Sequence, residues 1–202
     1  MVFAKAPQPG RVKTRLVPRL GKTGAARLHA RLVERVARTA AAARLGRVEL
    51  YCAPRMRHPF FASLARRHGL RLRAQGAGDL GARMQRAFDR VLQEADAALL
   101  IGSDCPALRA ADLRAAARAL RRGADAVLAP AEDGGYALIG LRRTRKQLFD
   151  GIAWGGPQVL EQTRARLRRL RWRWVELRTV WDVDRPEDVA RLAHSGLLRR
   201  PP

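Results

Sequence analysis

The stretch Ala97-Ala-Leu-Leu-Ile-Gly-Ser-Asp-Cys-Pro106 decides the fold class. Its five apolar residues, 97–101, are followed at once by a glycine and then by an acid. A continuous apolar run of this length is typical of a strand that is covered on both faces, as strands are in parallel sheets. Outward from this run, strand-like segments alternate with segments of helical periodicity. The pattern predicts an α/β fold, a three-layer α/β/α sandwich around a mostly parallel mixed sheet.

The expected elements cover most of the chain. Strands are predicted at 2–4, 48–52, 70–73, 97–101, 126–129, 137–141 and 172–177, and helices at 23–44, 60–67, 79–94, 113–120 and 157–170, with a last helix starting near Pro186. We expect one domain over residues 1–198 and a frayed tail at 199–202. The first strand is short for a central position, and a start codon upstream of Met1 would explain this.

Composition narrows the class of protein. The chain has 202 residues, 47% of them apolar, which is enough for a packed core. It contains no apolar stretch of transmembrane length and no signal peptide, so we expect a cytoplasmic protein without a membrane span. The two cysteines form no CxxC and the four histidines are scattered, which predicts reduced, partly buried thiols rather than a zinc site.

The formal net charge of +23 has several readings. A basic chain can bind nucleic acid, a membrane surface or phosphorylated substrates. Only four of the 41 basic residues are lysines, and many arginines recur at helical spacing, which favours solvent-exposed helix faces for most of the charge. There is no recognisable nucleic-acid motif, so we expect no specific nucleic-acid partner.

The segment after the first strand, residues 5–15, is rich in proline and basic residues. It carries Lys5, Arg11, Lys13 and Arg15 around Gly10, without the spacing of a Walker A loop or of GxGxxG. Cations on a preorganised loop suit a di- or triphosphate. The alternative is a solvated basic turn.

Acids follow the later strands, where open α/β sheets bind ligands. Asp104 is a candidate ligand for Mg²⁺ or Mn²⁺ supported by Ser103, or else it caps the next turn. Asp133-Gly-Gly-Tyr136 suits a close ligand contact or an ordinary hairpin turn. Asp182 and Asp184 lie two apart and, in an extended strand, point the same way.

Pro186 predicts the start of the last helix, and acids favour the first turn of a helix. Asp188 is therefore the best candidate for a purely structural role.

These motifs, in this order, resemble a bacterial transferase family with the glycosyltransferase-A (GT-A) fold, whose members are assigned as glycosyltransferases and include some linked to arsenosugar biosynthesis. The resemblance rests on segments 3–16, 78–84, 101–106, 133–141 and 182–188 and on Trp154. It extends more distantly to phospholactate guanylyltransferase and the molybdenum-cofactor guanylyltransferases. One departure is that no Asp-x-Asp follows the central strand, where Asp104 is the one acid. Some metal-dependent members of the fold use this single-Asp form, which favours the nucleotidyltransferase side.

The resemblance implies a nucleotide-diphospho-sugar transferase fold, a divalent metal and a nucleotide-activated small-molecule substrate. By this analogy Asp104, Asp184 and Asp182 bind the metal. The implied catalytic residues are Asp133 and Asp104, with Asp133 as the general base. The implied nucleotide-binding residues are Lys5, Gly10, Lys13, Thr14, Arg15 and Ser103, and the implied acceptor-binding residues are Gly134, Gly135, Tyr136 and Trp154. The activity is then glycosyl transfer, or alternatively nucleotidyl transfer from an NTP to a phosphorylated small molecule.

Overall fold

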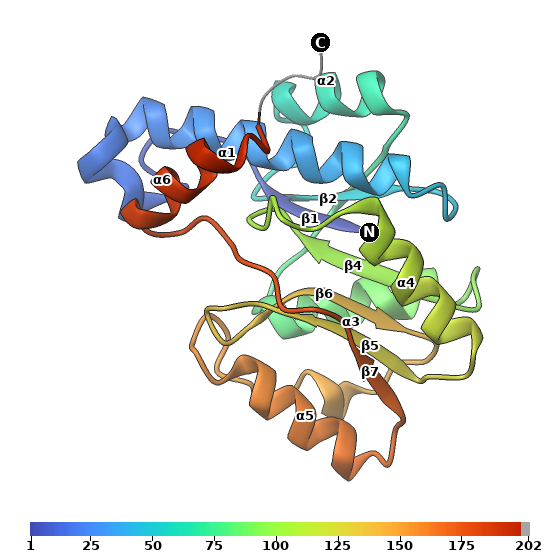
Figure 1. Cartoon of the computed structure of the whole chain (residues 1–202). Helices are drawn as coiled ribbons and strands as arrows, with labels where there is room; N and C mark the ends of the chain where they lie inside the picture. The colour runs from blue at the N-terminus through green and yellow to red at the C-terminus, as the bar shows by residue number, and fades with distance from the viewer. Residues whose placement is uncertain (199–202) are drawn as a thin grey trace.

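The computed structural model describes residues 1–198, and the predicted tail at 199–202 lies outside the described residues. A seven-stranded sheet runs through the centre in the order β3-β2-β1-β4-β6-β5-β7 (Figure 1). The strands are β1 (Val2–Lys5), β2 (Glu49–Ala53), β3 (Arg71–Ala74), β4 (Ala98–Gly102), β5 (Ala126–Pro130), β6 (Tyr136–Leu141) and β7 (Trp174–Glu176). The prediction of an α/β fold with a mostly parallel mixed sheet is confirmed.

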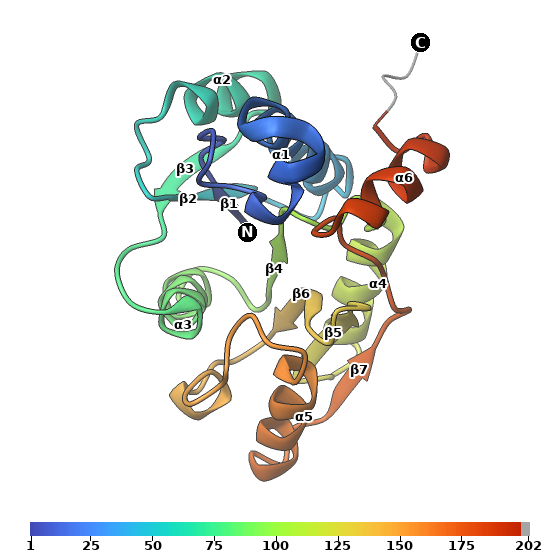
Figure 2. The same cartoon turned by 90° about the vertical axis from the view of Figure 1, so that its left-hand side faces the viewer.

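Helices cover both faces of this sheet (Figures 1 and 2). The helices are α1 (Val17–Ala42), α2 (Pro59–His68), α3 (Leu80–Val91), α4 (Ala110–Arg121), α5 (Val159–Arg169) and α6 (Pro186–Ser195), with short 3₁₀ turns η1 (Thr14–Leu16) and η2 (Lys146–Leu148). Buried residues of α1, α2 and α4 share one apolar cluster, and those of α3 and α5 share another. Helix α6 packs on the first half of α1 in a third, smaller cluster.

The strand directions bring the loops of interest to one edge. Strand β1 pairs in parallel with β2 and β4, and only β6 runs antiparallel, between β4 and β5. Because β5 runs in the direction of β4, the β5–β6 hairpin lies at the edge where β1 and β4 end. The segments after β1, β4 and β5 therefore meet there, as parallel sheets require.

Helix α1 and strand β7 differ most from their predicted bounds. Helix α1 begins at Val17 rather than near residue 23, because a first turn is joined to the main helix across Gly21, whose φ is 68°. Strand β7 is three residues long rather than six, because it lies at the edge of the sheet and pairs with β5 over Trp174–Glu176.

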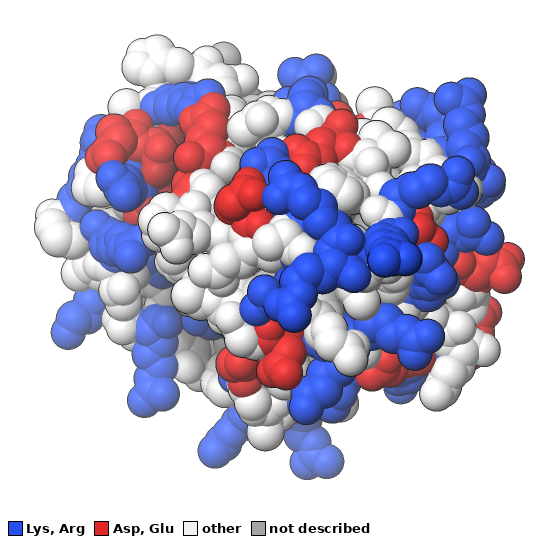
Figure 3. Space-filling view, turned by 90° about the horizontal axis from the view of Figure 1, so that it is seen from below, with Lys and Arg blue, Asp and Glu red and all other residues white. Residues whose placement is uncertain are grey.

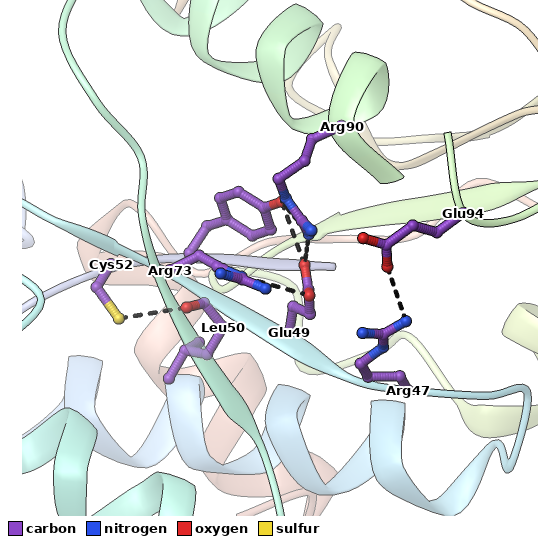
Figure 4. A network of polar contacts seen from close by, with 8 residues as sticks. Arg47, Glu49, Leu50, Cys52, Arg73, Arg90 and Glu94 are labelled. Carbon is purple, nitrogen blue, oxygen red and sulfur yellow. Dashed lines mark hydrogen bonds and ion pairs between the residues drawn. The ribbon is translucent and has the colours of Figure 1, made fainter. Parts of the chain in front are cut away.

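A buried charge network lies on the α3 side of β2 (Figure 4). The Glu49 carboxylate, with its side chain 5% exposed, pairs with Arg90 of α3 and with Arg73 of β3. Arg90 also donates to the Tyr51 hydroxyl, at 2.9 Å, and burial raises the pKa of that phenol. Two guanidinium groups offset the desolvation of one carboxylate, so the network ties α3 to the sheet.

No helix among residues 1–198 is long and apolar enough to cross a membrane. Both cysteines are free and buried.

Candidate active site

The loop after β1 turns back toward the sheet through Lys13. This residue has a φ of 48°, a left-handed conformation uncommon outside glycine, and it directly precedes η1. Its side chain is only 4% exposed, whereas Lys5, at the end of β1, is exposed. The turn directs the Lys13 ammonium inward, to the edge where β1 and β4 end.

There the ammonium meets two carboxylates from distant parts of the chain. Lys13 Nζ lies 3.0 Å from Asp104 Oδ1, after β4, and 3.6 Å from Asp184 Oδ1, just before α6. The Arg15 guanidinium pairs with the other oxygen of Asp184. The structure thus brings together four of the predicted site residues.

The histidine at this position was missed in the sequence. His29, on the buried face of α1, is 3% exposed, and its Nε2 lies 3.0 Å from the Lys5 carbonyl oxygen. A carbonyl only accepts, so Nε2 carries the proton. Burial lowers the pKa of His29, whose Nδ1 lies 3.7 Å from Asp104 Oδ1. Within residues 1–198, His29 Nδ1 has no hydrogen-bond partner, and Asp104 Oδ1 makes no hydrogen bond besides its ion pair with Lys13.

Hydrogen bonds to backbone carbonyls hold together the two segments that carry Asp104 and Asp184. The Val183 N–H donates to the Asp104 carbonyl at 3.0 Å, and the Cys105 thiol donates to the Trp181 carbonyl at 2.9 Å. These bonds fix the segment before α6 against the loop after β4. Asp188 accepts from the backbone N–H groups of Asp184 and Arg185, at 3.0 and 2.7 Å, which is the structural role predicted for it.

A cavity of about 320 Å³ opens beside Asp104. Its polar wall includes Asp133 and Asp182, and its aromatic wall includes Tyr136 and Trp154. The two acids form no ion pair with any described residue, and the pKa of Asp182 is raised to about 6 by burial and by the Asp133 charge. No lysine or arginine of the described chain lines this cavity.

Asp182 and Asp184, on either side of Val183, have different surroundings. Residues 181–184 form no strand in the structure, so the geometry predicted for an extended strand is absent. Asp184 pairs with Lys13 and Arg15, whereas Asp182 lines the cavity beside Asp133. Asp182 is therefore placed toward the cavity rather than with the two acids that contact Lys13.

The Asp133 turn is a hairpin turn and also a wall of the cavity. The Gly135 N–H donates to Asp133 Oδ1 at 2.9 Å, and the Gly134 carbonyl accepts from the Leu160 N–H of α5 at 2.9 Å. The segment forms a hairpin turn and lines the cavity, and its contact with a ligand stays a prediction. Ser103, Gly10 and Thr14 lie in the loops around Lys13 and do not line the cavity.

The amino-acid sequence matches one known protein family. Residues 36–156, more than half of the chain, match DUF2064, described as uncharacterized protein conserved in bacteria. The chain belongs to this family. No functionally curated protein matches the sequence.

Solved structures share the fold. A "putative nucleotide-diphospho-sugar transferase" from Desulfovibrio desulfuricans G20 is 32% identical, with a TM-score of 0.86 over 96% of this chain and 85% of that one. The 4-diphosphocytidyl-2C-methyl-D-erythritol synthase of Anaerococcus prevotii is 9% identical, with a TM-score of 0.63 over 98% and 97% of the chains. Glucosyl-3-phosphoglycerate synthase of Mycobacterium tuberculosis, solved with Mn²⁺ and UDP, is 12% identical, with a TM-score of 0.56 over 98% and 75%. The fold is that of nucleotide-diphospho-sugar transferases and nucleotidyltransferases.

The residues present fit a divalent cation that shares its coordination with a substrate. No group of three His, Cys, Asp or Glu side chains within residues 1–198 forms a complete metal site. Asp104 and Asp184, however, direct one oxygen each at the Lys13 ammonium, and within residues 1–198 Asp104 Oδ1 makes no hydrogen bond besides this ion pair. Magnesium is commonly held by one or two carboxylates together with substrate phosphates.

Proposed function

We propose that this protein is a metal-dependent glycosyltransferase, which takes a nucleotide-diphospho-sugar donor and a small-molecule acceptor. The observation that carries the proposal is the convergence of Lys13, Asp104 and Asp184 at the strand ends, next to a cavity walled by acids and aromatic rings. The first part suits a diphosphate with its cation, and the second suits a sugar and an acceptor.

The donor diphosphate lies over the loop after β1 in this proposal. Lys5 and Arg15 are exposed there, and Lys13 stands at the inner end of the same loop. Charge-assisted contacts to phosphate oxygens offset the desolvation of a diphosphate. A divalent metal held by Asp104 and Asp184 supplies neutralisation of the leaving diphosphate.

The cavity receives the acceptor. Trp154 and Tyr136 offer apolar faces of the kind on which sugar rings pack, and Asp133 offers a carboxylate. One Asp133 oxygen is engaged by the Gly135 N–H, which orients the carboxylate. Asp133 serves as general base in the proposal, accepting the proton of the attacking hydroxyl.

The charge of the cavity favours glycosyl transfer over the alternative. A nucleotidyltransferase that acts on a phosphorylated acceptor must neutralise the phosphate of that acceptor. The described part of the cavity wall has three carboxylates, Asp104, Asp133 and Asp182, and no basic side chain. An anionic acceptor would be repelled there. Nucleotidyl transfer remains the second candidate because of the single Asp104 after β4 and the fold shared with the cytidylyl-transferring synthase.

Calorimetric titration tests the donor site. UDP, GDP and their sugars are titrated with Mn²⁺ or with EDTA into the wild type, Asp104→Asn and Asp96→Asn. Asp96 is exposed in the loop before β4, so its variant is matched in charge and remote from the site. We expect one nucleotide to bind with Mn²⁺, with affinity reduced about tenfold or more in Asp104→Asn and unchanged in Asp96→Asn.

The product separates the two candidates. Phosphorus NMR of a turnover mixture shows a nucleoside diphosphate after glycosyl transfer and pyrophosphate after nucleotidyl transfer from an NTP. Pyrophosphate would replace the first candidate by the second. No metal-dependent binding of UDP, GDP or any of their sugars would overturn the donor-site assignment.

A further inference from the structure

Lys13 differs from every other lysine of the chain. Lys5, Lys22 and Lys146 are exposed, as expected for a side chain that is rarely buried without a partner. The Lys13 side chain is 4% exposed and contacts carboxylates rather than water. Its burial therefore depends on Asp104 and Asp184.

The carboxylate oxygens of Asp104 and Asp184 need the positive charge of the Lys13 ammonium. Asp104 Oδ1 lies 3.0 Å from the Lys13 ammonium and 3.7 Å from His29 Nδ1, which has no hydrogen-bond partner within residues 1–198. His29 is 3% exposed and its Nε2 is engaged by the Lys5 carbonyl, so the Asp104 oxygen lies against a buried imidazole and the ammonium. Asp184 Oδ1 faces the same point. A positive charge close to these atoms is what stabilises them together.

We propose that the Lys13 ammonium balances the charge of Asp104 and Asp184 when no metal is bound, and that it competes with the divalent metal for these two carboxylates. The proposal rests on the metal-dependent function proposed above and adds an order of events. The Lys13 ammonium leaves the carboxylates when the metal arrives with the nucleotide, and it then contacts the donor phosphates. In this proposal the same lysine neutralises carboxylates before metal and nucleotide bind, and phosphates after they bind.

A linked equilibrium follows from this competition. Metal alone must displace Lys13 without offering it a new anion, so it binds weakly. Metal that arrives with a diphosphate provides the anion, so nucleotide and metal strengthen each other. Removal of the ammonium must then strengthen the binding of metal alone while it weakens the binding of nucleotide.

Direct Mn²⁺ binding tests the proposal without any turnover. Free Mn²⁺ is followed by electron paramagnetic resonance during titration of the wild type, Lys13→Met, Lys13→Gln and Lys22→Met, with no nucleotide present. The Lys22 side chain lies against Gly10 of the same loop and is exposed, so Lys22→Met controls for loss of a nearby charge. We expect Mn²⁺ to bind about tenfold more tightly or better to both Lys13 variants, less than twofold more tightly to Lys22→Met, and no more tightly than wild type to Lys13→Met/Asp104→Asn.

Each outcome of the Mn²⁺ titration either supports or overturns the competition. Thermal melting identifies a variant that fails to fold, and either folded Lys13 variant is sufficient. Unchanged or weaker Mn²⁺ binding in a folded Lys13 variant overturns the competition, and so does an equal gain in Lys22→Met. A separate titration of the wild type with nucleotide and Mn²⁺ reports on the proposed function, so its failure is distinguishable from failure of the Lys13 proposal.

Discussion

At the scale of single residues, the cavity wall at Asp133 depends on glycine at position 134, which has no side chain. Its φ is 87°, and a Cβ there would lie 1.9 Å from the Pro157 carbonyl oxygen. Its own carbonyl accepts from the Leu160 N–H, at the start of α5. Backbone of the β5–β6 hairpin and backbone of the segment before α5 are therefore in direct contact, with Asp133 carried on the hairpin.

Gly134→Ala is expected to separate the hairpin from α5. The substitution combines a left-handed backbone with a clash against backbone, which cannot relax by a rotamer change, so we expect destabilisation of about 2 kcal/mol or more. Urea unfolding measures the loss. Gly155→Ala is the control, because Gly155 also has a positive φ, of 84°, but its Cβ would meet nothing within 4 Å. A smaller loss in Gly134→Ala than in Gly155→Ala would contradict the close contact.

The sequence predicted some residues of the site better than others. Asp104, Asp133 and Asp184 were predicted because acids after strands are visible in a pattern of apolar runs. His29 was missed because its role comes from a contact between α1 and the end of β1, which no local spacing encodes. Lys13 was predicted to face phosphates, and its burial against two carboxylates is visible only in three dimensions.

At the scale of elements, the order of strands is harder to predict than their existence. The seven strands and the six helices were predicted from periodicity, with boundaries shifted by a few residues. The antiparallel direction of β6 was not predicted for that strand, because an apolar run such as 137–141 has no direction. The pairing of Ile101 with Leu138 depends on contacts across the sheet.

Edge strand β7 is secured to α5 by one bidentate ion pair. Arg164 Nε and one terminal nitrogen donate to the two Glu176 oxygens at 2.8 and 2.7 Å. Both side chains are about one-quarter to one-third exposed. The Arg164 guanidinium lowers the pKa of Glu176 below its ordinary value of 4.5.

Arg164→Met is expected to destabilise the fold in a pH-dependent way. Because the folded state lowers the pKa of Glu176, the pair stabilises above the unfolded pKa, and the stabilisation is lost as pH falls through the folded pKa. We expect a loss of about 1 kcal/mol at pH 7. The difference from wild type should shrink as pH falls below about 4.5, when unfolding is followed by urea at each pH.

Arg169→Met on the same helix is the control, since Arg169 forms no ion pair within residues 1–198. A deficit of Arg164→Met that is the same at pH 3 and pH 7 would assign the loss to packing rather than to the ion pair.

At the scale of the whole molecule, the charge is distributed in two different ways. Figure 3 shows basic side chains spread over the lower face of Figure 1, with acidic groups interspersed. The cavity has the opposite composition, with three carboxylates and no basic residue in its described wall. The net charge of +23 is therefore a property of the surface, and the chemistry proposed for the site needs only the few cations of the loop after β1.

Such a surface is expected to attract nucleic acid weakly and without sequence preference. Arginine contacts to phosphates release counterions, so affinity for a labelled DNA duplex should fall by about 100-fold or more between 50 and 200 mM salt. Fluorescence anisotropy with two duplexes of unrelated sequence measures this. Lys13→Met should bind both duplexes like the wild type, because its ammonium is buried. Binding that persists at 200 mM salt, or that prefers one duplex about tenfold, would make the basic surface a functional site in its own right.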